Sequence, residues 1–189
     1  MRSGRIGVVH GRFQPFHLGH FDYVKMALRE CEYLFIGIAN PDPSLTLPHT
    51  SNLKRAEVIS NPFTYYERAA MINSTLLNRG YAENQFQIVP FPINYPDLIK
   101  SYVPSDAIFF LTIYDAWGYA KRKALLDQGY SVKVLEEGSI ELKVANGTTI
   151  RECMINRAMW AQFVPSEVNS YIVENNLIER RLLAVPENE

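Results

Sequence analysis

The chain has 189 residues, of which 47% are hydrophobic and 21% are charged, and its 20 acidic and 19 basic residues give a formal net charge of −1 at pH 7. This composition is typical of a soluble globular protein, and we predict a single domain at residues 1–184 with a flexible tail at residues 185–189. Because the charge is balanced and no apolar run approaches about 18 residues, we expect no nucleic acid and no membrane as partner, and a cytoplasmic protein.

The stretch at residues 11–20 reads Gly-Arg-Phe-Gln-Pro-Phe-His-Leu-Gly-His. It follows the apolar run Ile6–Val9 and precedes apolar residues at helical spacing, so it predicts a strand that turns into a helix at about Leu18–Cys31. The first N–H groups of a helix are unpaired and its dipole is positive there, so such a turn favours anions. The pattern therefore indicates a phosphate or nucleotide site.

Several residue types in this stretch suit that site. Gly11 and Gly19 leave the backbone open to close approach by a triphosphate, and Arg12 offers a positive fork for phosphate oxygens. His17 and His20 lie three residues apart and share one helix face, although a His pair alone is also compatible with a structural role or with half of a metal site. The nucleotide-binding residues predicted here are Gly11, Arg12, Phe13, Gln14 and Gly19.

The next segments continue an alternation of strands and helices. Tyr33–Ala39 predicts a second strand, and a strand, helix and strand within about 35 residues favour a right-handed crossover in a parallel sheet. Residues 41–60 break the pattern with prolines and polar side chains, and a connection of this length is either a functional lid or a disordered segment. Arg55 is the candidate lid contact to phosphate.

The helix that follows begins at Phe63-Thr64. Thr64 and Glu67 have the spacing of a capping box, and Gly80 lies just past the expected end. We interpret Glu67 as part of that box, with direct substrate contact as the alternative, and Arg68 as a structural ion-pair partner.

The middle of the chain predicts two more strands, at residues 85–91 and 107–113, separated by a proline-rich region with room for a short helix. Asp115 and Trp117 follow the second of these strands, and open parallel sheets bind ligands beyond the carboxyl ends of their strands. Trp117 offers a face to a flat ring, and Asp115 can accept from a hydroxyl or an amide. The alternative is that Asp115 caps the next helix and Trp117 packs on it.

A helix at about residues 117–128 then leads to a strand at residues 131–135 and to a turn or hairpin at residues 136–143. The sequence Asn-Gly-Thr-Thr-Ile-Arg at residues 146–151 opens another helix. Arg151 in its first turn opposes the helix dipole by about 0.3–1 kcal/mol unless an anion binds beside it. With the hydroxyls of Thr148 and Thr149, it predicts a second phosphate cradle rather than an ordinary capped helix.

A last amphipathic helix is expected from residue 165 to about residue 181. Together the elements predict an α/β fold, a Rossmann-like open sheet of about five parallel strands with helices on both faces. The chain has no Gly-x-Ser-x-Gly elbow, no His-Glu-x-x-His and no P-loop sequence, which argues against serine hydrolase, zinc and P-loop chemistry.

Three motifs together resemble the H-x-G-H nucleotidyltransferase superfamily, in the form found in archaeal-type nicotinamide-mononucleotide adenylyltransferases. They are the stretch at residues 11–20, Asn-Pro-Phe-Thr-Tyr-Tyr-Glu-Arg at residues 61–68, and Asn-Gly-Thr-Thr-Ile-Arg at residues 146–151, in the order of that family. The chain departs from the family at Asn146, where relatives usually carry Ser, and at residues 115–121, where they carry a Gly-Asn-Pro-like stretch. The second departure leaves the identity of the acceptor substrate open.

The resemblance implies transfer of AMP from ATP to a phosphorylated acceptor, nicotinamide or nicotinate mononucleotide, with release of pyrophosphate. It implies His17, His20 and Arg151 as catalytic residues, Thr148 and Thr149 as nucleotide-binding residues, and Mg²⁺ bound mainly through the triphosphate without metal-binding side chains. Asp115 and Trp117 are the candidate acceptor contacts because of their position after a strand. We also expect a homo-oligomer. The alternatives are a cytidylyltransferase or adenylyltransferase acting on a different small phosphate or phosphonate, and a non-catalytic nucleotide-sensing protein.

Overall fold

The computed structural model describes residues 5–46, 57–138 and 146–183. The candidate lid residue Arg55, the predicted tail at residues 185–189 and most of the predicted hairpin at residues 136–143 lie outside these ranges.

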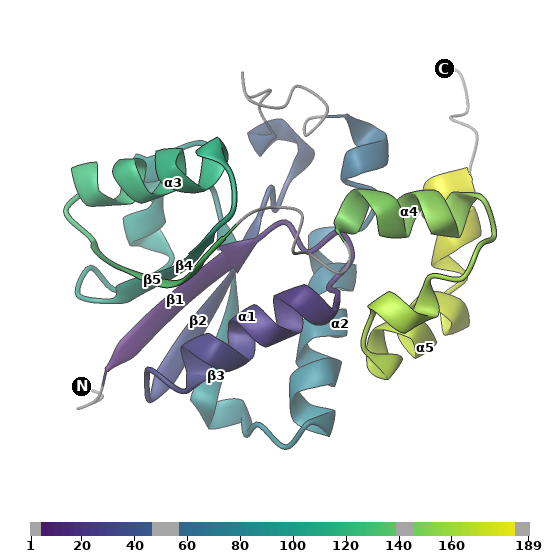
Figure 1. The fold of residues 1–189 in the computed structure, drawn as a ribbon, viewed down its shortest axis with the longest axis horizontal. Coiled ribbons are helices and arrows are strands. Elements are labelled where there is room, and N and C mark those ends of the chain that lie inside the picture. The colour runs from purple at the N-terminus through teal and green to yellow at the C-terminus, as the bar shows by residue number, and fades with distance from the viewer. Residues whose placement is uncertain (1–4, 47–56, 139–145, 184–189) are drawn as a thin grey trace.

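Five parallel strands form one open sheet in the order β3-β2-β1-β4-β5 within the described residues (Figure 1). The first strand is therefore central, and the chain adds neighbours on either side of it, which confirms the predicted Rossmann-like α/β sheet. The strands are β1 (Ile6–Gly11), β2 (Tyr33–Ala39), β3 (Phe86–Phe91), β4 (Ile108–Ile113) and β5 (Ser131–Glu137).

Helices cover both faces of this sheet, as predicted. Neighbouring residues of a strand point to opposite faces, so Val9 of β1 packs in the cluster that contains α1 and α2, whereas Val8 packs in the cluster that contains α3. Burial on both faces explains why β1, β2 and β4 are almost continuously apolar, whereas the edge strand β5 is mostly exposed. The helices are α1 (Leu18–Leu28), α2 (Tyr65–Asn78), α3 (Ala116–Asp127), α4 (Gly147–Ile155) and α5 (Ser166–Glu174).

The C-terminal region differs from the single helix predicted for residues 165–181. Helix α5 ends at Glu174, and Asn176 adopts a left-handed conformation with φ 54° before a π-helical turn at Glu179–Leu183. Asparagine tolerates this backbone conformation better than most residues, so the two consecutive asparagines at 175–176 end the helix. The reversal brings Arg181 to Glu67, where Nη2 and Oε1 are 2.9 Å apart.

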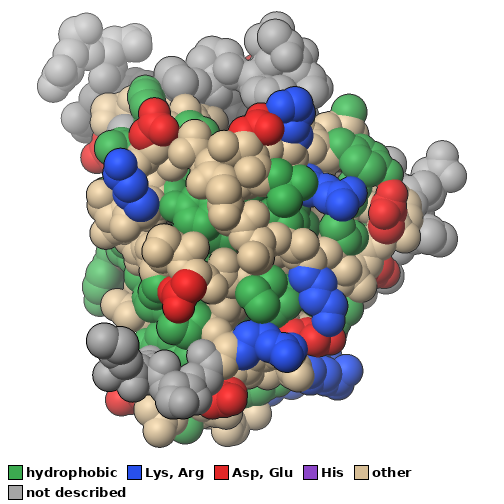
Figure 2. Space-filling model, turned by 90° about the vertical axis from the view of Figure 1, so that its left-hand side faces the viewer, with side chains coloured by type: hydrophobic (Ala, Val, Ile, Leu, Met, Phe, Trp, Pro, Cys, Tyr) green, Lys and Arg blue, Asp and Glu red, His purple; other side chains and the backbone are tan. Residues whose placement is uncertain are grey.

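The surface on the side of the molecule where α3 lies carries Lys and Arg side chains interspersed with Asp and Glu (Figure 2). Among the described helices, none is long and apolar enough to cross a membrane.

Candidate active site

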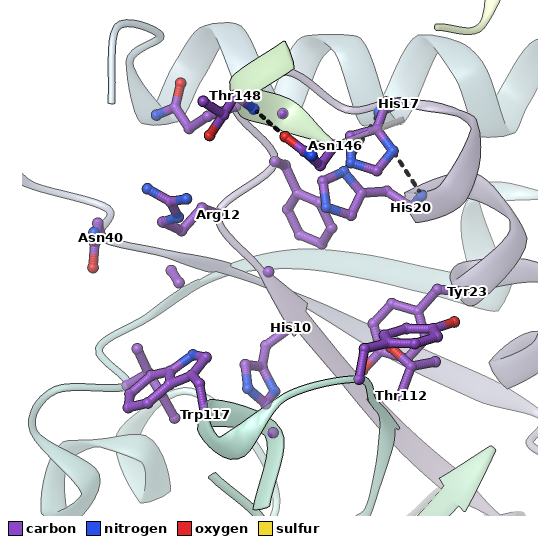
Figure 3. Close-up of a pocket in the computed structure, with 18 of the residues that line it drawn as sticks. His10, Arg12, His17, His20, Tyr23, Asn40, Thr112, Trp117, Asn146 and Thr148 are labelled. Carbon is purple, nitrogen blue, oxygen red and sulfur yellow. Dashed lines mark hydrogen bonds between the residues drawn. The ribbon is translucent and has the colours of Figure 1, made fainter. Parts of the chain in front are cut away.

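A cavity of about 490 Å³ opens at the carboxyl ends of the strands, between the starts of α1, α3 and α4 (Figure 3). It brings together the predicted site residues that the structure describes, with the exception of Gly19. In particular, the same cavity is lined by His17 and His20 from the first motif and by Arg151 from the third motif. The two predicted phosphate cradles therefore face one space, although they lie more than a hundred residues apart in the sequence.

The two histidines form a capping box at the start of α1. His20 N donates to His17 Nδ1 at 3.3 Å, and His17 N donates to His20 Nδ1 at 3.4 Å. The rings stack with their centroids 3.6 Å apart. Because each Nδ1 accepts a backbone hydrogen bond, the neutral form of each ring carries its proton on Nε2. The pair thus provides two Nε2–H donors from one fixed arrangement.

The start of α4 is capped by Asn146. Its Oδ1 accepts from Thr148 N at 3.0 Å and from Thr149 N at 3.1 Å. Asn146 is therefore the N-cap residue of this helix. The cap uses two of the N–H groups at the start of α4. A bound phosphate would therefore meet the Thr148 and Thr149 hydroxyls and Gly147 N, or displace the Asn146 side chain.

Arg151 joins this helix start to the turn between β1 and α1. Its side chain is buried, with Nη1 donating to Gln14 O at 2.6 Å and Nη2 donating to Thr148 Oγ1 at 3.3 Å. Burial lowers the pKa of the Arg151 guanidinium. A Cβ atom at Gly147 would lie 2.9 Å from Gln14 O, so glycine is needed for this close approach. Since a guanidinium has five N–H donors, Arg151 can hold the turn and still bind phosphate.

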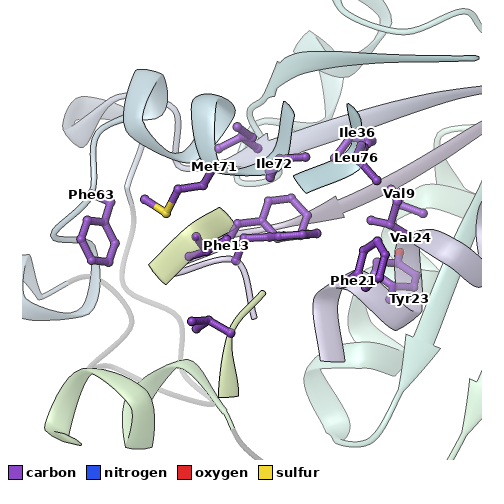
Figure 4. Packing of buried hydrophobic residues seen from close by; sticks show 14 of the residues in the cluster. Val9, Phe13, Phe21, Tyr23, Val24, Ile36, Phe63, Met71, Ile72 and Leu76 are labelled. Carbon is purple, nitrogen blue, oxygen red and sulfur yellow. The ribbon is translucent and has the colours of Figure 1, made fainter. Parts of the chain in front are cut away.

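Two of the predicted nucleotide-binding residues use their side chains for the fold. Phe13 is fully buried in the core (Figure 4). The Gln14 amide pairs with the backbone of Phe63, donating to Phe63 O at 2.9 Å and accepting from Phe63 N at 2.9 Å. Phe13 and Gln14 can therefore meet a nucleotide through their backbone.

The two glycines of the first motif also have packing reasons. A Cβ atom at Gly11 would lie 2.8 Å from the Phe13 ring, and one at Gly19 would lie 3.3 Å from the His17 ring. Gly11 lines the cavity, whereas Gly19 does not line it.

The predicted capping box of α2 is confirmed: Thr64 N donates to Glu67 Oε2 at 2.8 Å and Glu67 N donates to Thr64 Oγ1 at 3.2 Å. Glu67 is absent from the described lining of the cavity.

The prediction that Arg68 is an ion-pair partner is wrong. Its buried guanidinium donates instead to backbone carbonyls, those of Arg12 at 2.8 Å, Ala39 at 2.7 Å, Asn40 at 2.8 Å and Thr64 at 3.1 Å. Burial lowers the pKa of Arg68 to about 10, which leaves the group cationic at neutral pH. Buried carbonyls need a hydrogen-bond donor, and Arg12, Ala39 and Asn40 line the cavity. Arg68 therefore stabilises the backbone that forms the cavity wall.

Asp115 and Trp117 both line the cavity. The capping interpretation of Asp115 is confirmed, and its contact with the acceptor stays a prediction. Its Oδ1 accepts from Gly118 N at 2.9 Å, so Asp115 caps α3 while facing the site. Arg12 also lines the cavity, and its Nη1 donates to Ser60 O at 3.4 Å.

The sequence reasoning missed several residues at the rim and floor of the cavity. His10 is the last residue but one of β1 and Asn40 follows β2, so the rule that ligands collect beyond strand ends could have found them. Lys121 lies within α3, where nothing in the sequence marks it. Among the described lining residues the cations are Arg12, Lys121 and Arg151, against the single carboxylate of Asp115. This excess of positive charge suits polyanionic ligands.

Known proteins similar to this chain include cytidylyltransferases and adenylyltransferases. A family model described as cytidylyltransferase-like matches residues 8–120. Phosphonoformate cytidylyltransferase of Streptomyces viridochromogenes is 37% identical over 92% of this chain and 94% of its own length. Nicotinamide-nucleotide adenylyltransferase of Thermoplasma volcanium is 35% identical over 90% of this chain and 86% of its own length.

Among solved structures, the bifunctional NMN adenylyltransferase/ADP ribose pyrophosphatase of Francisella tularensis is similar over 95% of this chain, with a TM-score of 0.68 and 20% sequence identity. The chain spans about half of that protein, 53% of its length. At this level of identity the likeness shows the fold.

Proposed function

The chain belongs to the cytidylyltransferase-like family and is a nucleotidyltransferase, and within that family we propose that it transfers the cytidylyl group of CTP to a small phosphonate or phosphate acceptor. The observation that carries this choice is the likeness, over nearly the whole of both chains, to a phosphonoformate cytidylyltransferase. The excess of cationic lining residues supports it, because both substrates are polyanions.

The proposed reaction is a single displacement at the α-phosphorus of the nucleotide. An oxygen of the acceptor attacks the α-phosphorus, the bond from that phosphorus to the bridging oxygen breaks, and pyrophosphate leaves with the electron pair. A phosphate or phosphonate oxygen is already largely ionised near pH 7, so no protein base has to generate the nucleophile.

The protein contributes positions and charge to this reaction. We assign the Nε2–H groups of His17 and His20 to the phosphate oxygens on which charge develops, and Arg12, Arg151 and the start of α4 to the departing pyrophosphate. Because donors at both helix starts are held by hydrogen bonds within the protein, they need little rearrangement when charge moves.

We propose that Mg²⁺ accompanies the triphosphate. Among the described residues no group of three or more His, Cys, Asp and Glu side chains could hold a metal, so its ligands would come mainly from phosphate oxygens and water. When bound, it would neutralise charge on the leaving pyrophosphate.

A second candidate is the AMP transfer to nicotinamide or nicotinate mononucleotide that the motifs suggest. The similarity to the Thermoplasma volcanium adenylyltransferase favours it, and Trp117 in the cavity offers a face to a pyridine ring.

A substrate matrix distinguishes the candidates. CTP, ATP and GTP are each combined with phosphonoformate, other small phosphonates, nicotinamide mononucleotide, nicotinate mononucleotide and phosphopantetheine, and pyrophosphate release and product mass are measured. We expect turnover with CTP and a small phosphonate. Dinucleotide formation from ATP and a mononucleotide alone would favour the second candidate, and binding of nucleotide without pyrophosphate in any pair would favour a sensing protein.

A further inference from the structure

His10 is a buried histidine whose ring nitrogens are both unsatisfied. It is the last residue but one of β1, it is 5% exposed, and neither its Nδ1 nor its Nε2 has a hydrogen-bond partner. In the described part of the chain, His10 is the one residue with buried side-chain nitrogen or oxygen atoms left in this state. Its ring stacks on Phe91, with centroids 4.6 Å apart and 16° between the planes.

A phenylalanine would fill this place without leaving polar atoms unpaired. Burying an unpaired polar group weakens a fold, whereas an apolar group of the same shape does not. Sites where a chain breaks such a rule are expected to be functional. We therefore expect a bound ligand to provide the hydrogen-bond partner of the imidazole.

The position of His10 indicates which ligand that is. It lines the cavity, and Figure 3 places it with Trp117 across from His17, His20 and Asn146. The triphosphate has its donors at those helix starts. The opposite side, where His10 lies, is thus left for the other substrate.

The groups around His10 suit an oxygen-rich anion. Lys121 lines the same cavity, and the pKa of His10 is held well below its usual value by burial and then by the charge of Lys121. A neutral imidazole has one N–H to donate. The amides of Asn40 and Asn94 also line the cavity, with Asn94 Nδ2 donating to Asn40 Oδ1 at 3.4 Å.

We infer that His10 recognises the acceptor, its ring N–H donating to an oxygen of a small, multiply charged phosphonate or carboxylate while Lys121 balances the charge. The inference rests on the proposed function. Both ring nitrogens are covered in this structure, and a half-turn about the Cβ–Cγ bond exchanges each nitrogen with a carbon. This turn keeps the ring plane on Phe91 while changing which ring edge faces the ligand.

The test is His10→Phe, which keeps the ring and its stacking and removes the donor. With CTP and phosphonoformate as substrates, we expect the KM for phosphonoformate to rise about tenfold or more, because a hydrogen bond to a charged group is lost. The KM for CTP should stay within about twofold, since the triphosphate is bound elsewhere. The thermal midpoint should be unchanged or higher, because an unpaired polar group is removed.

Two further variants complete the experiment. Tyr130→Phe alters a buried aromatic residue on the same side of the sheet that does not line the cavity, and both KM values should stay as in the wild type. His10→Gln provides an N–H donor again, from an amide in place of the imidazole. Its KM for phosphonoformate should fall between those of the wild type and His10→Phe. It also provides the comparison with the wild type if His10→Phe does not fold.

Other outcomes overturn the inference. An unchanged KM for phosphonoformate removes the role of His10, equal increases in both KM values indicate a structural role, and an increase for CTP alone places His10 at the nucleotide. If the wild type shows no turnover with any small phosphonate, the proposed acceptor and the inference about His10 are both contradicted. A wild type active on phosphonoformate with an unaffected His10→Phe removes the inference alone.

Discussion

The two stacked histidines at the start of α1 cap that helix, and we propose that they also donate to the phosphate oxygens. The Nδ1 of each histidine accepts a hydrogen bond from the backbone N–H of the other histidine, so each neutral ring carries its proton on Nε2. A pair that is fixed in this way needs no reorientation when negative charge moves from the α-phosphate to pyrophosphate. The same hydrogen bonds that begin the helix therefore fix the two rings that we assign as donors in the proposed reaction.

His20→Ala should lower kcat by about 10²–10³-fold, the usual cost of removing one such donor. The variant also loses one half of the capping box, which costs about 0.5–2 kcal/mol of stability. Pyrophosphate release measures the first effect and thermal unfolding the second. Lys123→Ala, which removes an exposed ion pair with Asp127, is the matched control and should retain full activity. Near-normal turnover of His20→Ala would remove its assignment.

At the residue scale, the sequence predicts the site residues that can be identified from residue type and spacing alone. His17, His20 and Arg151 belong to this group, and the cavity unites them. Gln14 does not, because its role depends on Phe63, 49 residues further along the chain. His10 does not either, since its burial depends on a ring from β3.

At the scale of elements, local signals located the strands and helices, and long-range contacts decided how they end and join. The capping box of Thr64 and Glu67 was predictable, because its partners lie three residues apart. The role of Arg68 was not, since its acceptors come from the turn after β1, the end of β2 and the start of α2. The Arg68 guanidinium is a shared donor to all of these carbonyls, and the Thr64 carbonyl also accepts the backbone N–H of Arg68 at 3.1 Å.

Arg68→Met should destabilise the protein by at least about 3 kcal/mol, because each buried carbonyl left without a donor costs about 1–3 kcal/mol. For a chain of this length the thermal midpoint should fall by about 6 °C or more. Urea unfolding checks the free energy, and Arg122→Met on the exposed face of α3 is the control for loss of an arginine. A midpoint within about 2 °C of the wild type would show that the carbonyls find other partners.

At the scale of the whole molecule, the C-terminal region completes a site that the N-terminal region begins. Arg151 reaches Gln14 across 137 residues, and Arg181 reaches Glu67 across 114. The order of strands and helices follows from periodicity along the chain, and the sequence therefore predicts the sheet. The docking of α4 and α5 depends on such distant pairs, which no local pattern contains. The break after α5 has a local cause, the two asparagines at 175–176, and the amphipathic spacing on either side of them masked it.

One of these distant contacts is bidentate. Arg79 at the end of α2 donates to Glu167 in the first turn of α5, with Nε to Oε1 at 3.1 Å and Nη2 to Oε2 at 3.3 Å. Burial acts to raise the pKa of Glu167, but its own backbone N–H, Arg79 and Ser166 outweigh it, and the pKa is lowered. A carboxyl with a lowered pKa in the folded state stabilises the fold above its unfolded pKa, and this contribution disappears as the pH falls through the folded value.

Glu167→Gln should therefore lower the free energy of unfolding at pH 7, by no more than about 1 kcal/mol because Arg79 is partly exposed. At about pH 3, below the ordinary glutamate pKa of about 4.3, the difference from the wild type should shrink, since the wild-type carboxyl is becoming protonated. Urea unfolding of both proteins at the two pH values measures this, and adding Arg79→Met to each completes a double-mutant cycle. A difference that is the same at both pH values would mean that Glu167 acts through shape rather than charge, and that the C-terminal region docks without this ion pair.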